Sequence, residues 1–186
     1  MKSPARKSSP DITSPITILG IDPGSIFCGY GVITSNGRDA RYIASGRIAP
    51  PASKPLHVRL RSIHEALTEI IGTYHPTDMV VEKIFFAKSA KAALHLGHAR
   101  GVVLLAAACG EVTLHECSAL EVKKAIVGYG RAEKSQVQEM VKMILNIRGT
   151  LYPDSADALA LALCYMNTLQ FNIAVKSQNN PKTENL

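Results

Sequence analysis

The sequence predicts an α/β domain built on a mixed five-stranded sheet that is flanked by helices. Short apolar runs alternate with longer amphipathic stretches along most of the 186 residues, which is the pattern of strands and helices in a layered domain. The first three apolar runs follow one another closely enough to pair as an antiparallel meander. Each of the two later runs is preceded by a helical stretch, the connection that parallel strands require. The expected order is therefore βββαβαβααα.

Five apolar runs are expected to form the strands. The first, ITILGID, is apolar on both faces, as in the central strand of a buried sheet. Asn36 and Gly37 separate the second run from the third, and this dipeptide favours a tight turn because both residues tolerate positive φ. In chain order, the expected strands are residues 16–22, 29–35, 40–48, 78–82 and 112–117.

Five stretches are expected to be helical. In the first, apolar residues recur at spacings of three and four from Leu56 to Tyr74, and Pro55 fits its start. The second is rich in alanine and glycine, so it is able to pack closely against a neighbour. Pro153 suits the first turn of the last helix, which is expected to end near Leu169. The expected helices are residues 56–74, 88–109, 118–128, 133–146 and 153–169.

One folded domain is expected between two tails. Residues 1–15 are rich in Ser, Pro and Lys and residues 171–186 are mostly polar, so both are expected to be disordered and residues 16–170 to form the domain. The formal net charge is +6, of which the two tails carry +2 and +1, so the domain carries +3. A basic balance suits a polyanionic partner, although a solvated basic surface is the ordinary alternative.

The composition favours a cytoplasmic protein over a membrane or secreted one. The sequence has no run of about 18 uncharged apolar residues, so no membrane helix is expected. The basic N-terminal segment is not followed by an apolar stretch, so it is not a secretory signal. The four cysteines form no CxxC pair, which leaves zinc and redox motifs unsupported.

Four carboxylates lie at the ends of apolar elements. Asp22 and Glu82 each end a predicted strand, while Asp154 and Asp157 lie three residues apart at the start of the last predicted helix, on one face. Ligands of an open α/β sheet bind at the carboxyl ends of its strands. Each acid alone has an ordinary alternative, such as a helix cap, a turn or a surface ion pair. Together they favour a site for divalent cations, because unpaired buried charges are costly and Mg²⁺ prefers carboxylate oxygens.

The predicted chemistry is metal-dependent cleavage of phosphate esters. Two cations about 3.5–4 Å apart would neutralise the acids and bind the attacking and leaving oxygens of a phosphodiester. The segment GYGRAEKSQV supplies glycines that let a phosphate approach the backbone, together with the cations of Arg131 and Lys134. The ordinary alternative for this segment is a helix-entry loop with solvated side chains.

Four segments of the chain resemble, in order and in spacing, the RuvC family of Holliday-junction resolvases. The segments are ILGIDPGSIFCGYGVI, VVEKIFFAKSAKAALHLGHARGV, VGYGRAEKSQV and DSADALALAL, and the resemblance covers residues 16–169. It implies an RNase H-like fold and a homodimer that cuts four-way DNA junctions with paired symmetric nicks, in recombination and DNA repair. It also implies Mg²⁺ as the cofactor, with Mn²⁺ able to substitute and two ions in each active site.

The resemblance also implies roles for individual residues. The acidic quartet of the family corresponds to Asp22, Glu82, Asp154 and Asp157. Its junction-binding lysines correspond to Lys123 and Lys134, and the aromatic residue that distorts the junction corresponds to Phe85, whose ordinary alternative is core packing. The helix expected at residues 88–109 corresponds to the dimer interface, and its ordinary alternative is burial within the monomer. The family context further implies the branch-migration proteins RuvA and RuvB as partners.

Three other classes are weighed against this one. A YqgF-like relative, acting on RNA or other branched DNA, would share the first strand but is not expected to carry GYGRAEKSQV. A non-catalytic junction-binding scaffold would have no reason to keep four mutually repelling acids. An actin-like ATPase shares the Asp-Pro-Gly turn after the first strand, but 186 residues are too few for two such domains.

Overall fold

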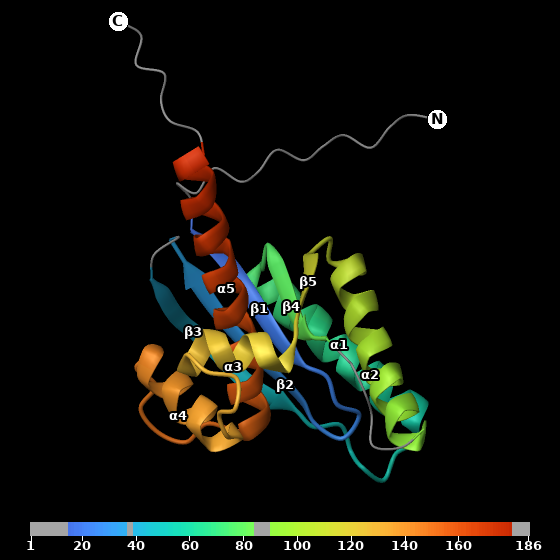
Figure 1. Cartoon of the computed structure of the whole chain (residues 1–186). Coiled ribbons are helices and arrows are strands. Elements are labelled where there is room, and N and C mark those ends of the chain that lie inside the picture. The colour runs from blue at the N-terminus through green and yellow to red at the C-terminus, as the bar shows by residue number, and fades with distance from the viewer. Residues whose placement is uncertain (1–14, 37–38, 84–89, 180–186) are drawn as a thin grey trace, which may run out of the picture.

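The computed structural model describes residues 15–36, 39–83 and 90–179, which form three layers with the sheet in the middle (Figure 1). The sheet has the strand order β3-β2-β1-β4-β5. The strands are β1 (Ile16–Asp22), β2 (Cys28–Ser35), β3 (Ala40–Ile48), β4 (Asp78–Glu82) and β5 (Thr113–Cys117). The helices are α1 (Leu56–Tyr74), α2 (Ala90–Cys109), α3 (Ala119–Val127), α4 (Lys134–Ile144) and α5 (Pro153–Asn179).

The central strand β1 connects the antiparallel and parallel halves of the sheet. It pairs antiparallel with β2 and parallel with β4, while β2 pairs antiparallel with β3 and β4 pairs parallel with β5. The predicted mixed five-stranded sheet and the order βββαβαβααα are therefore confirmed. Ile21 is in register with Val81, so the parallel pair β1 and β4 brings Asp22 and Glu82 to the same edge of the sheet.

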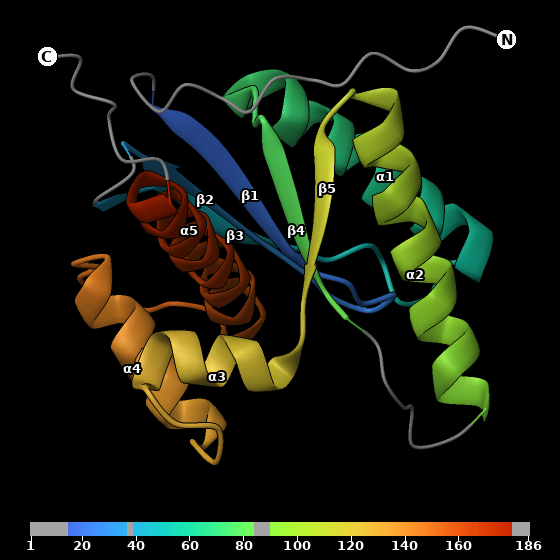
Figure 2. The same ribbon diagram turned by 45° about the horizontal axis from the view of Figure 1, so that its top comes forward.

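Helices cover both faces of the sheet. Successive side chains of a strand point to opposite faces, and β1 follows this rule. Ile18 packs into the apolar cluster formed with α3, α4 and α5, whereas Leu19 and Ile21 pack into the cluster formed with α1 and α2. Figure 2 shows the two groups of helices on opposite sides of the sheet. Burial on both faces explains why β1 is apolar throughout.

Two helices next to the edge that carries Asp22 and Glu82 have well-defined starts. At α3, Ser118 Oγ accepts a hydrogen bond from the backbone N–H of Glu121, and the Ser118 N–H donates to Glu121 Oε2 at 2.7 Å. At α4, the backbone N–H of Glu133 donates to Gln136 Oε1 at 2.8 Å. These bonds satisfy backbone groups that a helix start leaves unpaired. They define the first turn of each helix.

The last helix is longer than the sequence pattern predicts. It was expected to end near Leu169, with residues 171–186 as a disordered tail, but α5 continues to Asn179. The physical reason is that no glycine or proline interrupts the chain between Pro153 and Pro181, so there is no stop signal at Leu169. Figure 1 shows the end of α5 projecting beyond the sheet.

Helix α2 leaves much of its apolar surface exposed. Four of its residues pack into the core: Ala99, Val103, Ala106 and Ala107. Leu94 and Leu105 are instead 63 % and 54 % exposed.

Within the described ranges, α2 is the one helix that is long and apolar enough to cross a membrane, and 22 % of the relevant window is buried in the fold. Length and composition alone are weak evidence for a membrane span. The start predicted at Lys88 lies outside the described residues.

Candidate functional site

The site depends on how closely α5 approaches the sheet. A Cβ atom on Gly20 of β1 would lie 1.9 Å from the carbonyl oxygen of Ala158, and one on Gly29 of β2 would lie 2.1 Å from the carbonyl oxygen of Asp154. Only glycine leaves room for the helix backbone at these two positions. The first turns of α5, which carry Asp154 and Asp157, therefore lie directly over the ends of β1 and β2.

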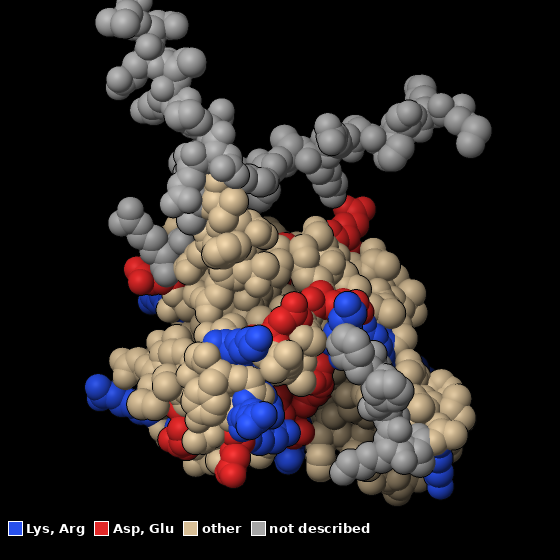
Figure 3. All heavy atoms as spheres, in the orientation of Figure 1, with Lys and Arg blue, Asp and Glu red and all other residues tan. Residues whose placement is uncertain are grey.

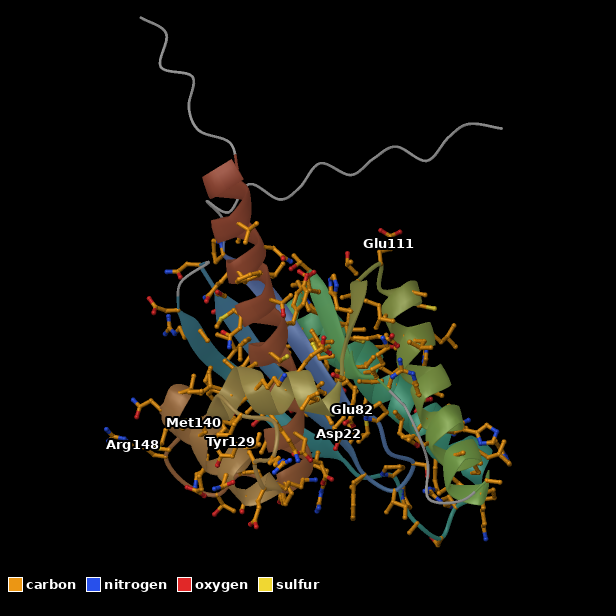
Figure 4. All side chains as sticks on the ribbon, viewed as in Figure 1. Asp22, Glu82, Glu111, Tyr129, Met140 and Arg148 are labelled. Carbon is orange, nitrogen blue, oxygen red and sulfur yellow. The ribbon has the colours of Figure 1, made fainter. Side chains whose placement is uncertain are left out.

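Four carboxylates from three elements influence one another at this edge. The pKa of Asp22 is raised to about 7, chiefly by burial and then by the charge of Asp157, with smaller contributions from Glu82 and Asp154 and an opposing one from Lys134. Burial and the charge of Asp157 also raise the pKa of Glu82. Figure 4 shows Asp22 and Glu82 close together at the end of the sheet. The arrangement therefore favours any cation that binds among these oxygens.

Lys134 already supplies one such cation. Its Nζ lies 2.5 Å from Asp157 Oδ2. Partial burial lowers the pKa of Lys134, but the hydrogen bond to Asp157 and the charges of Asp157, Asp22 and Asp154 raise it overall. Burial raises the pKa of Asp157, and the bond from Lys134 opposes that rise. The lysine thus stabilises the ionised form of an acid that would otherwise be costly to bury.

A cavity of about 330 Å³ connects the acids with two lysines. Its polar wall consists of Asp22, Glu82, Asp157, Lys123 and Lys134. Its apolar wall consists of Ala119, Val122, Val137, Ala160 and Leu161, contributed by α3, α4 and α5. Figure 3 shows acidic and basic side chains gathered on this face of the molecule. A polyanion bound here would meet both the two lysines and the acids.

The acids have the chemistry of a divalent-cation site but not a closed geometry. In the described parts of the chain, no three His, Cys, Asp or Glu side chains already form a cage that could hold a metal ion. Lys134 instead lies against Asp157. The donors are all carboxylate oxygens, which suit hard cations such as Mg²⁺ and Mn²⁺. The pKa values of Asp22, Glu82 and Asp157 are all raised, as expected for carboxylates that are partly buried close to one another, so their donor chemistry fits a bound cation.

The structure brings together most of the residues singled out from the sequence. Asp22, Glu82, Asp157, Lys123 and Lys134 line one cavity. Asp154 and Arg131 do not line it.

Asp154 points to a different neighbour, with Oδ2 3.8 Å from Arg47 Nη1, although its charge still acts on Asp22. Arg131 is exposed in the loop before α4. Phe85 lies outside the described residues.

Two arginines near the site were not predicted. Arg47 contacts Asp154, and its guanidinium carbon lies 4.0 Å from the ring centre of Phe27 and 4.5 Å from that of Tyr152. Arg100 Nη1 donates a 2.6 Å hydrogen bond to the Glu82 carbonyl oxygen. No sequence motif marks either arginine, because each meets its partners only through the tertiary fold.

The mixed sheet, with α5 laid across it and acids at the strand ends, defines an RNase H-like nuclease domain. The chain belongs to the RuvC family, described as crossover junction endodeoxyribonuclease RuvC, whose family profile matches residues 18–165. Proteins with that name are similar to it: the one from Magnetococcus marinus is 43 % identical, with 86 % of this chain and 88 % of the relative covered. For Heliobacterium modesticaldum the identity is 45 %, with 87 % and 100 % covered.

Solved structures agree with this assignment. Thermus thermophilus RuvC in complex with a Holliday junction substrate is similar with a TM-score of 0.80 and 31 % identity, covering 84 % of this chain and 96 % of that one. The yeast mitochondrial Holliday junction resolvase Ydc2 is similar with a TM-score of 0.61 and 10 % identity, covering 88 % and 86 %. The second similarity concerns the fold alone.

Proposed function

We propose that this chain is a structure-selective DNA endonuclease that resolves four-way junctions by paired symmetric nicks. The observation that carries the proposal is the cavity in which Asp22, Glu82 and Asp157 face Lys123 and Lys134. Acids alone indicate phosphate chemistry, and lysines in the same cavity indicate a polyanionic substrate. Membership of the RuvC family narrows that substrate to crossover junctions.

The acids would hold the cofactor, Mg²⁺ or in its place Mn²⁺, with two ions in each site. Asp22, Glu82, Asp154 and Asp157 are the residues assigned to this role. When bound, such ions activate water and stabilise the leaving oxygen of a phosphodiester. Gly20 and Gly29 let the backbone of α5 approach β1 and β2 closely, which brings the first turns that carry Asp154 and Asp157 to the sheet edge of Asp22.

The lysines bind and orient the DNA. Lys123 and Lys134 lie on α3 and α4, whose first turns are fixed by hydrogen bonds from Ser118 and Glu133. Contacts to backbone phosphates position a substrate without reading its sequence. We assign Arg131, exposed in the preceding loop, to the same role, and Phe85 to stacking at the strand exchange. RuvA and RuvB are the proposed partners, in the cytoplasm.

A second copy of the chain is the proposed occupant of the exposed face of α2. Leu94 and Leu105 are exposed there, and a Cβ on Gly97 or Gly101 would have nothing within 4 Å, so a second helix has room to approach. A two-fold dimer carries two equivalent sites, as paired nicks require.

Leu105→Glu should convert a dimer to a monomer in analytical ultracentrifugation, with Leu120→Glu on α3, at similar exposure, as control. Partition of the wild type into lipid vesicles without dimerisation would contradict this assignment.

The cleavage assay uses a labelled immobile four-way junction and a linear duplex of the same sequence, each with Mg²⁺. Symmetric nicks are expected on the junction alone. Asp22→Asn should lower the rate about 100-fold or more while binding persists. Asp39→Asn, the same substitution at an exposed position, is the control. Binding without nicks by the wild type would indicate a scaffold and overturn the enzymatic proposal.

A further inference from the structure

A cluster of one cation and two aromatic rings lies beside the acidic site. Phe27 follows the turn after β1, Arg47 lies in β3, and Tyr152 immediately precedes α5. The Arg47 guanidinium is stacked against both rings, at 4.0 Å from the centre of Phe27 and 4.5 Å from that of Tyr152. Arg47 contacts Asp154, which does not line the cavity, so the cluster lies beside the cavity and not within it.

Core packing does not explain these side chains. Phe27 is 41 % exposed and Tyr152 is 53 % exposed, and neither belongs to the two apolar clusters of the fold. Large exposed apolar groups that gather at one place mark interaction sites more often than scattered ones do. Their position next to Asp154 makes the DNA substrate the relevant partner.

The loop that carries Phe27 is held in place. A Cβ on Gly24 would lie 2.0 Å from the carbonyl oxygen of Phe27, so the turn is closed tightly on itself. Arg59 of α1 donates a hydrogen bond to the carbonyl oxygen of Ser25 in the same turn. The aromatic ring is therefore presented by a fixed backbone, which lowers the entropy lost when a ligand binds.

The guanidinium N–H groups of Arg47 are available to a ligand. Its ion pair with Asp154 is 3.8 Å long, beyond hydrogen-bond range, and no hydrogen bond joins its guanidinium to another residue that the structure describes. The two rings orient the planar guanidinium, and its N–H groups therefore point in fixed directions within that plane. Arginine in such a setting is suited to a phosphate oxygen, while the partly exposed rings are suited to an unstacked base.

We propose that Phe27, Arg47 and Tyr152 form a subsite for an unpaired nucleotide of the strand that enters the acidic site. Arg47 binds a backbone phosphate, and an exposed face of Phe27 or Tyr152 stacks on the base. This inference rests on the proposed nuclease function, because it takes junction DNA as the ligand. It adds a DNA contact on the β3 side of the acids, whereas the proposed DNA-binding lysines lie on α3 and α4.

The test measures affinity by fluorescence anisotropy, in EDTA, with a labelled four-way junction. Phe27→Leu combined with Tyr152→Leu should weaken binding about 5- to 100-fold. Arg47→Met should weaken binding and reduce the slope of log affinity against log salt by about 1. The controls are Phe171→Leu, an exposed aromatic on α5, and Arg61→Met, an exposed arginine on α1. Both should bind as the wild type does.

A crosslinking experiment identifies the contact itself. Junctions carrying 5-iododeoxyuridine next to the strand exchange are irradiated, and the crosslinked peptide is mapped by mass spectrometry. Crosslinks at Phe27 or Tyr152, lost in the leucine variants, support the subsite. Unchanged affinity together with crosslinks elsewhere overturns it. An Arg47→Met variant that loses cleavage at normal affinity and salt slope also overturns it, since Arg47 would then only position Asp154. Failure of the wild type to nick the junction contradicts the nuclease proposal separately, because binding and crosslinking are measured without cleavage.

Discussion

Lys134 Nζ lies 2.5 Å from Asp157 Oδ2, so the cavity contains an internal cation among its acids. The same lysine lowers the pKa of Asp22, Glu82 and Asp157 against the effect of burial. A residue in this position has two roles that an experiment is able to separate. It limits repulsion among the acids in the free protein, and we propose that it binds a phosphate once the acids bind another cation.

Lys134→Met should weaken junction binding at low salt. Removing one lysine–phosphate contact is expected to reduce the slope of log affinity against log salt by about 1. The slope is obtained from anisotropy titrations between 50 and 200 mM salt, the range over which about 6–10 phosphate contacts change affinity strongly. Lys142→Met, on the same helix and paired with Glu139, is the control. An unchanged slope would exclude Lys134 from the phosphate contacts.

Gly29→Ala should disrupt both the fold and the site. The added Cβ would lie 2.1 Å from the carbonyl oxygen of Asp154, so α5 has to shift away from β2. Overpacking of this kind costs about 1–3 kcal/mol of unfolding free energy, which urea denaturation measures. Gly72→Ala on α1 is the control: its Cβ meets nothing within 4 Å, and alanine is favoured in a helix. Equal stability of the two variants would show that α5 tolerates displacement.

Asp22→Asn should stabilise the protein when divalent cations are removed. The folded pKa of Asp22 is about 7, well above the value near 3.9 in an unfolded chain. The unfolded state therefore binds fewer protons, and ionised Asp22 destabilises the fold increasingly as pH rises from about 4 to 7. The melting temperature of the variant in EDTA should exceed that of the wild type by several degrees at pH 8, and by less at pH 5. A lower melting temperature at pH 8 would contradict the electrostatic account.

Asp78 should contribute stability that is lost in acid. It accepts hydrogen bonds from Thr77 Oγ1 at 2.7 Å and Tyr165 Oη at 2.9 Å, and Oδ1 lies 2.7 Å from His115 Nε2. Burial raises its pKa, but these bonds outweigh burial and lower it overall. The stabilisation is thus complete above the unfolded pKa of about 3.9 and disappears as pH falls through the lower folded value.

Urea unfolding from pH 7 to pH 3 tests this with Asp78→Asn. The wild type should be the more stable protein at pH 7, and the difference should shrink below about pH 4. A difference that stays constant across this range would mean that Asp78 is not ionised in the folded state.

The sequence predicted the sheet better than it predicted the surroundings of the site. Strand runs such as ITILGID and DMVVE are short, apolar and clearly bounded, so β1 and β4 have the predicted limits. The predicted end of α5 was wrong. The helix continues past Leu169 because the sequence has no stop signal there.

Periodicity also does not reveal contacts between distant segments. Arg47 meets Phe27 and Tyr152 only because β2 and β3 pair and α5 lies across them. The ion pair of Lys134 with Asp157 likewise joins two helices that are apart in the sequence. The role of Phe85 in distorting the junction stays a prediction.

The most direct test of the metal-site proposal is a crystal structure of the protein with junction DNA and Mn²⁺, with anomalous diffraction to locate the ions. We expect anomalous peaks within ligand distance of Asp22 and of at least one other member of the quartet, with Lys134 Nζ no longer bonded to Asp157. Peaks that lie away from all four carboxylates, in a protein that still nicks the junction, would contradict it.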